Sequence, residues 1–179
     1  MKLRIITGTL GGRQFNSPHG NITHPMSEKI RGALFNIMGD IEGLTVFDAF
    51  AGSGAVSFEA LSRGAKHAFL IDDDKFAMRT IKENIEELGL HDQTTVQQAN
   101  IKSWTNNNRD KLFDIVVCDP PYDAVLEMLI QKLSRHVAPS GSLVVSWPSK
   151  EPIPVIEGME TLRHKTYGNA TLAFYKKTG

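Results

Sequence analysis

The feature that most constrains the fold is an alternation, from Leu44 onward, of short apolar segments with helix-like ones. Residues 44–47 and 67–71 have the length and composition of strands, and a helix-like segment follows each. Residues 113–118 are almost continuously apolar, which is typical of a strand buried on both faces. The alternation therefore predicts right-handed crossovers and a doubly wound, mostly parallel α/β sheet.

The two ends of the chain depart from this alternation. Residues 161–165 and 171–175 resemble two strands with no helix between them, so we expect the sheet to end in an antiparallel hairpin. At the other end, residues 3–7 and 13–15 predict a small hairpin, and a helix begins near Ser27. We expect an N-terminal extension over residues 1–40 and one main domain over 41–179. Further predicted elements are helices at 53–63, after 71 and around 125–133, and strands at 95–97 and 142–147.

Charge is unevenly distributed, although the formal net charge is zero. Residues 1–37 carry a net charge of +4, which leaves −4 on the rest of the chain. A basic end could steer a phosphate backbone to one face, although ordinary scatter of surface charge would give the same count. The candidate RNA contacts are Arg4, Arg13, Lys29 and Arg31.

Cysteine and histidine usage argues against a metal site. Cys118 is the single cysteine, and the six histidines show no metal-ligand spacing, so we expect no metal. Residues 1–7 contain no apolar signal-peptide core, and no apolar run approaches the roughly 20 residues that cross a bilayer. We expect a cytoplasmic monomer that does not contact a membrane.

A glycine-containing turn follows the first main strand and opens the next helix. Gly52 and Gly54 would let a ligand approach the backbone, and Asp72 lies 20 residues after Gly52, the spacing at which an acid reaches a ribose diol. Because residue 57 is serine, the third glycine of a dinucleotide motif is missing, and Asp48 would repel a pyrophosphate but attract an ammonium group. This pattern favours S-adenosyl-L-methionine over NAD. The predicted cofactor-binding residues are Asp48, Phe50, Ala51, Gly52, Ser53, Gly54, Asp72, Asp73, Asn100 and Ile101.

The strongest motif is Asp119-Pro120-Pro121-Tyr122, directly after the apolar strand 113–118. Two prolines fix the backbone, so the loop would present carbonyl acceptors rigidly beside the Asp119 carboxylate. An exocyclic amine of a nucleobase is a poor nucleophile, and these acceptors would favour a tetrahedral nitrogen. Tyr122 would stack on the extruded base. The motif predicts methyl transfer to such an amine, with these four residues as the catalytic group.

Residues 48–54, 59–65 and 119–122 together resemble the RsmD family of small-subunit ribosomal RNA methyltransferases. Residues 4–6, 12–13, 25–31, 34–36 and 167–168 extend the likeness over most of the chain. The resemblance implies a Rossmann-like class I methyltransferase fold with a seven-stranded sheet. It also implies transfer to the N2 amine of a guanine in 16S rRNA within the small ribosomal subunit. Met26 and Lys29 depart from the family, which usually has threonine and arginine there.

Three other functions are compatible with parts of the pattern. Asp119-Pro120-Pro121-Tyr122 also suits the N6 amine of adenine in DNA or rRNA, although the chain leaves little room for a DNA-recognition domain. A nicotinamide oxidoreductase is disfavoured by Asp48 and by the missing third glycine. A non-catalytic RNA-binding assembly factor is disfavoured by the intact catalytic motif.

Overall fold

The computed structural model describes residues 1–18, 26–121 and 127–178. These form two compact units, Met1–Ile101 and Lys102–Gly179. Seven strands belong to one sheet in the order β5-β4-β3-β6-β7-β9-β8, and β1 and β2 form a separate pair. The predicted α/β class, the seven-stranded mostly parallel sheet and the final antiparallel hairpin are confirmed. The proposed division at residues 40 and 41 stays a prediction.

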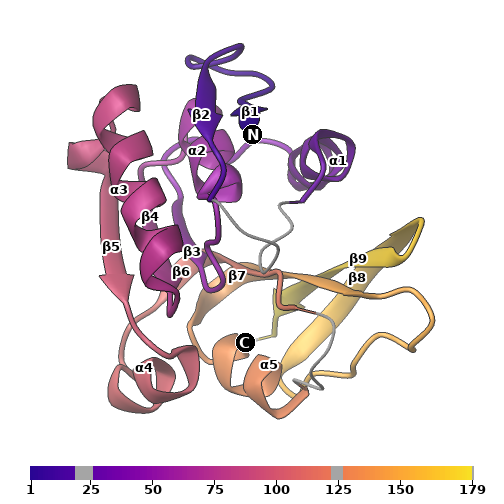
Figure 1. Cartoon of the computed structure of the whole chain (residues 1–179). Helices are drawn as coiled ribbons and strands as arrows, with labels where there is room; N and C mark the ends of the chain where they lie inside the picture. Colours follow the sequence, from indigo (N-terminus) through magenta and orange to yellow (C-terminus); the bar gives the residue numbers. More distant parts are fainter. Residues whose placement is uncertain (19–25, 122–126, 179) are drawn as a thin grey trace. The chain divides into compact units, whose positions relative to one another are not determined.

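The first unit combines a small hairpin with three parallel strands and the helices between them (Figure 1). Its strands β3, β4 and β5 pair in parallel, with Asp48 opposite Leu70 and Asp72 opposite Gln98. This register brings the carboxyl ends of the three strands to one edge. The elements are β1 (Lys2–Arg4), β2 (Gln14–Asn16), α1 (Glu28–Met38), β3 (Thr45–Asp48), α2 (Ala55–Ser62), β4 (His67–Asp72), α3 (Lys75–Leu88), the 3-10 helix η1 (His91–Gln93) and β5 (Thr94–Gln98).

The helix after β4 forms as its sequence predicts. Asp74 caps its first turn, where its carboxylate accepts a hydrogen bond from the Phe76 amide at 3.2 Å. Helix α3 packs on β4 and β5, and its apolar residues recur at helical spacing on the buried face. These residues are Ala77, Ile81, Ile85 and Leu88. Helix α1 likewise begins after Ser27, whose hydroxyl accepts a hydrogen bond from the Ile30 amide.

The second unit contains α5 (Glu127–Ser134) and the strands β6 (Phe113–Cys118), β7 (Val137–Pro148), β8 (Met159–Tyr167) and β9 (Ala170–Lys177). Strands β6 and β7 are parallel, whereas β9 runs antiparallel to both β7 and β8. Helix α4 (Ile101–Asn107) begins at the last residue of the first unit. The sequence gives only a polar stretch there. In the described part of the chain, no helix has the length and apolar character needed to span a membrane.

Candidate functional site

The turn between β3 and α2 has the shape that its glycines predict. Gly52 and Gly54 have positive φ angles of 56° and 86°, in the left-handed region that favours glycine. A Cβ added to Gly54 would lie 2.6 Å from the Phe58 ring, so a side chain at Gly54 would also displace that ring. Residues 51–54 are buried, with Ser53 3% exposed. The turn is therefore compact, with glycine required at Gly54 by both backbone and packing.

Asp72 connects the end of β4 to this turn. Its Oδ2 accepts a hydrogen bond from the Gly52 amide at 2.8 Å, and its Oδ1 accepts one from the Asp74 amide at 3.0 Å. Burial raises the pKa of Asp72 above its ordinary value, and these two hydrogen bonds act in the opposite direction. Each carboxylate oxygen has lone pairs for more than one donor, so Asp72 keeps capacity to accept hydrogen bonds from a diol.

The other predicted cofactor residues of this unit differ in exposure. Asp48 is buried and accepts a hydrogen bond from the Ser57 hydroxyl at 2.8 Å, so its carboxylate is directed to α2. Phe50 is half-buried, and Asp73 and Asn100 are exposed. The strand register places Asp72 at the carboxyl end of β4 opposite Gln98, and Asp73 and Asn100 follow these two strand ends at the same edge of the sheet. Ile101 is buried at the start of α4.

In the second unit, Asp119 directly follows the buried strand β6. Cys118 pairs with Val145 across the parallel strands, which brings Ser146 beside Asp119. Burial raises the pKa of Asp119 to about 6, and a hydrogen bond with the Ser146 side chain partly opposes that shift. Asp119 keeps some exposed surface, whereas Ser146 is buried. This arrangement provides a carboxylate that can accept a hydrogen bond at neutral pH and a proton near pH 6.

The rest of the predicted catalytic motif is only partly described. Pro120 is buried and Pro121 is exposed directly after it. Tyr122 lies outside the described residues. The sequence predicts the position of Asp119 and Pro120 because a strand boundary precedes them. Ser146 could not be found in this way, since it is distant in sequence and only the β6–β7 register brings it to Asp119.

The predicted RNA contact at Arg31 is wrong as a surface contact. Arg31 is 0% exposed, and its Nε donates a hydrogen bond to Glu59 Oε1 at 3.3 Å. Its Nη2 donates to the Arg4 backbone carbonyl, and burial lowers the pKa of Arg31 while Glu59 opposes that shift. A side chain held in this way cannot reach a phosphate at the surface. Sequence alone does not reveal this pairing, because Glu59 lies 28 residues away along the chain.

Glu59 holds the N-terminal segment against α2. Its two oxygens accept hydrogen bonds from the amides of Ile6 at 2.9 Å and Thr7 at 3.2 Å, in addition to the bonds from Arg31 and Arg63. The carboxylate is fully buried. These hydrogen bonds therefore fix the loop after β1, which explains why a glutamate is found on the buried helix α2.

The remaining N-terminal cations lie at the surface. Arg13 is exposed and donates a hydrogen bond to the Glu87 carbonyl at 3.0 Å. Lys29 is exposed, and Arg4 forms an ion pair with Glu28 at 2.9 Å. Their contact with RNA stays a prediction. Among the described residues, no cluster of histidine, cysteine, aspartate and glutamate could hold a metal ion.

The fold is that of the Rossmann-like class I methyltransferases, as its structural neighbours show. A structure named "Putative methyltransferase yhhF from Escherichia coli" aligns with a TM-score of 0.88 and 28% identity, over 99% of this chain and 98% of that one. Residues 3–176 match the model of the family described as "Conserved hypothetical protein 95". The chain belongs to this family.

Curated relatives align over nearly the whole chain. "Putative rRNA methyltransferase YlbH" of Bacillus subtilis is 32% identical over 99% of this chain and all of the relative. "Ribosomal RNA small subunit methyltransferase D" of Escherichia coli is 29% identical over 98% of this chain and 90% of the relative. The resemblance to the RsmD family inferred from the motifs is confirmed.

Proposed function

We propose that this chain transfers a methyl group from S-adenosyl-L-methionine to the N2 amine of a guanine in 16S rRNA, at the equivalent of position 966. The observation that carries the proposal is the Asp119 carboxylate at the end of β6, with its pKa of about 6 and its hydrogen bond to Ser146. The rRNA methyltransferase names of both full-length relatives support the substrate class.

The residues at the edge of the first unit fit such a cofactor. Asp72 can still accept hydrogen bonds from a ribose diol. At Gly52 and Gly54 no side chain blocks the approach of a ligand to the backbone. When bound, S-adenosyl-L-methionine supplies a methyl group on a positively charged sulfur. Asp73 and Asn100 are exposed at the same edge, where they would contact the ribose and the adenine.

Asp119 would act on the target amine in two ways. Ionised at neutral pH, it accepts a hydrogen bond from the amine, and the Pro120 carbonyl accepts the second. These bonds favour a tetrahedral nitrogen, whose lone pair would then be available for in-line attack on the methyl group of the cofactor. The nitrogen becomes cationic as it gains the methyl group, and a carboxylate with a pKa of about 6 can take its proton. The guanine must leave its stack to reach these acceptors, and we assign stacking on the flipped base to Tyr122.

We further propose the small ribosomal subunit as the docking partner of a monomeric, cytoplasmic enzyme. Residues 1–40 would form the RNA-proximal extension of a methyltransferase domain over 41–179. Within that extension Arg13 and Lys29 are exposed, so both can reach a phosphate.

The test is methyl transfer from labelled S-adenosyl-L-methionine to small subunits, naked 16S rRNA and duplex DNA, with the modified nucleoside identified by mass spectrometry. We expect N2-methylguanosine, with most label in the subunits. Asp119→Asn should remove the label and leave cofactor binding intact, which separates loss of chemistry from loss of fold. N6-methyladenine in any substrate would refute the guanine assignment, and an absence of label in all three would refute the function.

A further inference from the structure

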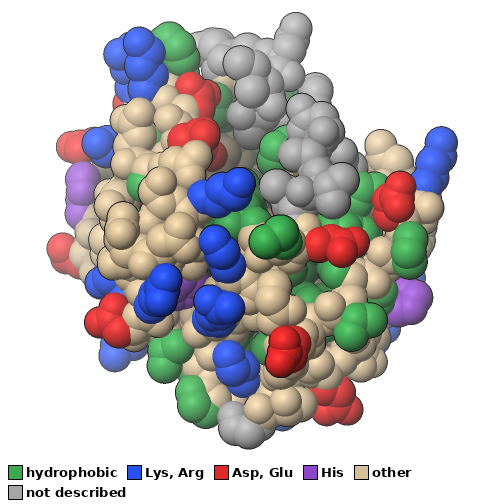
Figure 2. Space-filling model, turned by 90° about the horizontal axis from the view of Figure 1, so that it is seen from below, with side chains coloured by type: hydrophobic (Ala, Val, Ile, Leu, Met, Phe, Trp, Pro, Cys, Tyr) green, Lys and Arg blue, Asp and Glu red, His purple; other side chains and the backbone are tan. Residues whose placement is uncertain are grey.

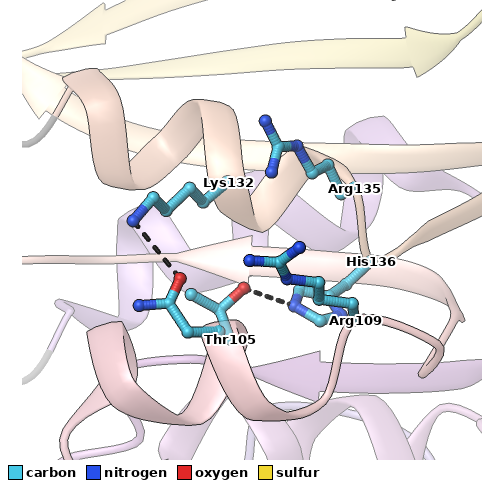
Figure 3. A pocket seen from close by; sticks show the side chains of 6 residues that line it. Thr105, Arg109, Lys132, Arg135 and His136 are labelled. Atoms are coloured by element: carbon cyan, nitrogen blue, oxygen red, sulfur yellow. Dashed lines mark hydrogen bonds between the residues drawn. The ribbon is translucent and has the colours of Figure 1, made fainter.

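Figure 2 shows Lys and Arg side chains gathered on the side of the molecule where Figure 1 places α4 and α5. In the second unit, a small pocket lies between the ends of these two helices (Figure 3). Its volume is about 50 Å³, far below the roughly 300 Å³ at which small-molecule sites begin. A metabolite is therefore too large for it. The lining residues are Thr105, Asn106, Arg109, Lys132, Arg135 and His136.

His136 forms a neutral and rigid floor for this pocket. Its Nδ1 lies 2.7 Å from the Lys111 carbonyl, which can only accept, so Nδ1 carries the hydrogen. Its Nε2 lies 2.6 Å from the Thr105 hydroxyl and therefore accepts that hydrogen bond. Burial lowers the pKa of His136, and the ammonium of Lys177 acts in the same direction, whereas the hydrogen bond to the Lys111 carbonyl and the charge of Asp110 partly oppose the shift. The histidine is thus held uncharged beneath the cations.

The Asp110 carboxylate acts on the pKa of His136, but among the described residues it forms no ion pair with the cations around this floor. Arg109 and Arg135 are exposed, and neither forms an ion pair with any residue that the structure describes. Figure 3 shows Arg109 next to His136, with Lys132 and Arg135 on the α5 side. Lys132 donates a hydrogen bond to Asn106 Oδ1 at 3.3 Å, a neutral acceptor that leaves its charge uncompensated.

Helix polarity explains only part of this arrangement. A cation near a helix C-terminus is stabilised by about 0.3–1 kcal/mol, and Lys132 in the last turn of α5 serves this purpose. Arg109 and Arg135 add like charge to the same small area, which opposes folding unless an anion binds there. Exposed guanidinium groups match phosphate oxygens in a planar fork, so a phosphodiester is the anion that this surface fits.

We propose that Arg109, Lys132 and Arg135 bind the phosphodiester backbone of the RNA substrate; this rests on the proposed function. The surface lies before the amino end of β6, whereas Asp119 follows its carboxyl end. A six-residue strand spans roughly 20 Å, so the phosphates bound here belong to a different part of the RNA from the target base. The surface positions the RNA and takes no part in the chemistry.

The test compares the double variant Arg109→Gln/Arg135→Gln with Arg163→Gln/Lys165→Gln, which removes the same charge from exposed positions on β8. Binding to 16S rRNA is measured over a series of salt concentrations, beside cofactor affinity and turnover. For the first variant we expect the slope of log affinity against log salt to fall by about 2. KM for RNA should rise with kcat and cofactor affinity unchanged, whereas the β8 variant should behave as the wild type.

Equal slopes for the two double variants would overturn the proposal. A loss confined to small subunits, with naked rRNA bound normally, would also overturn it, because the partner would then be an acidic protein surface. Binding to a homopolymeric RNA separates this proposal from the proposed function. If the wild type binds that RNA through Arg109 and Arg135 but methylates no rRNA, the function fails and the surface stands. If the wild type binds no RNA, both fail.

Discussion

Replacement of Asp119 by asparagine should stabilise the fold while it removes methyl transfer. The pKa of Asp119 is about 6 in the folded protein, against 3.8 for an unperturbed aspartate. The difference is about 2 pKa units, which corresponds to roughly 3 kcal/mol of unfavourable free energy for the ionised group in the folded state. Asparagine is neutral and can still accept a hydrogen bond from Ser146.

The direction of this stability change depends on whether the folded or the unfolded state binds the proton of Asp119 more tightly. The pKa of Asp119 is higher in the folded than in the unfolded state, so its ionisation destabilises the fold. This destabilisation is absent below about pH 3.8, grows as the pH rises and is complete above about pH 6. The gain from Asp119→Asn should therefore be small at pH 4 and complete at pH 7.5. We expect about 1–3 kcal/mol there, after allowance for the amide NH2 group that asparagine adds.

Urea unfolding of both proteins at pH 4 and pH 7.5 measures this difference. With a dependence of about 1–3 kcal/mol per molar urea, the midpoint at pH 7.5 should rise by roughly 1 M. Ser146→Ala serves as a control, since it removes the hydrogen bond but keeps the carboxylate and should not stabilise. If Asp119→Asn is equally stable or less stable than the wild type at pH 7.5, the reasoning that the ionised carboxylate lowers stability for the sake of activity is refuted.

Three further results are expected. Methyl transfer by the wild type should fall at pH 5 to roughly a tenth of its plateau rate. Ser146→Ala should move this acidic limb to higher pH, because the lost hydrogen bond favours ionised Asp119. A pH–rate profile of kcat/KM checks both results, and an unmoved limb would contradict the pairing of Ser146 with Asp119. Glu59→Ala should lower the free energy of unfolding by about 3–5 kcal/mol, because it leaves Arg31 buried without a counter-charge. If that cause is correct, denaturation of the double variant Glu59→Ala/Arg31→Met should show that part of the lost stability is recovered. Asp72→Asn should weaken S-adenosyl-L-methionine binding in calorimetry, whereas equal affinity would remove Asp72 from the ribose assignment.

The sequence predicts those parts of the site that a strand boundary positions. Asp119 directly follows an apolar strand and Asp72 is the last residue of another, so their place at the edge of the sheet follows from local pattern alone. The role of Gly54 can also be predicted from the sequence, because a left-handed turn before a helix requires glycine.

Residues that act through distant partners could not be predicted. Arg31 counts as a surface charge in the sequence, and its burial depends on Glu59, 28 positions away. Ser146 reaches Asp119 only through strand register. Helix α4 is polar and short, so it lacks the apolar periodicity that marks α3, and nothing in the local sequence marks its neighbour Arg109 as part of a cationic surface.

The two backbone hydrogen bonds of Asp72 have a consequence for the thermodynamics of ligand binding. Because this carboxylate already links the β3–α2 turn to the loop after β4, both segments lose conformational entropy when the protein folds. A ligand then meets a preorganised surface and need not order it. The Gly52 amide should accordingly be protected from hydrogen exchange before ligand is added, with little further protection afterwards.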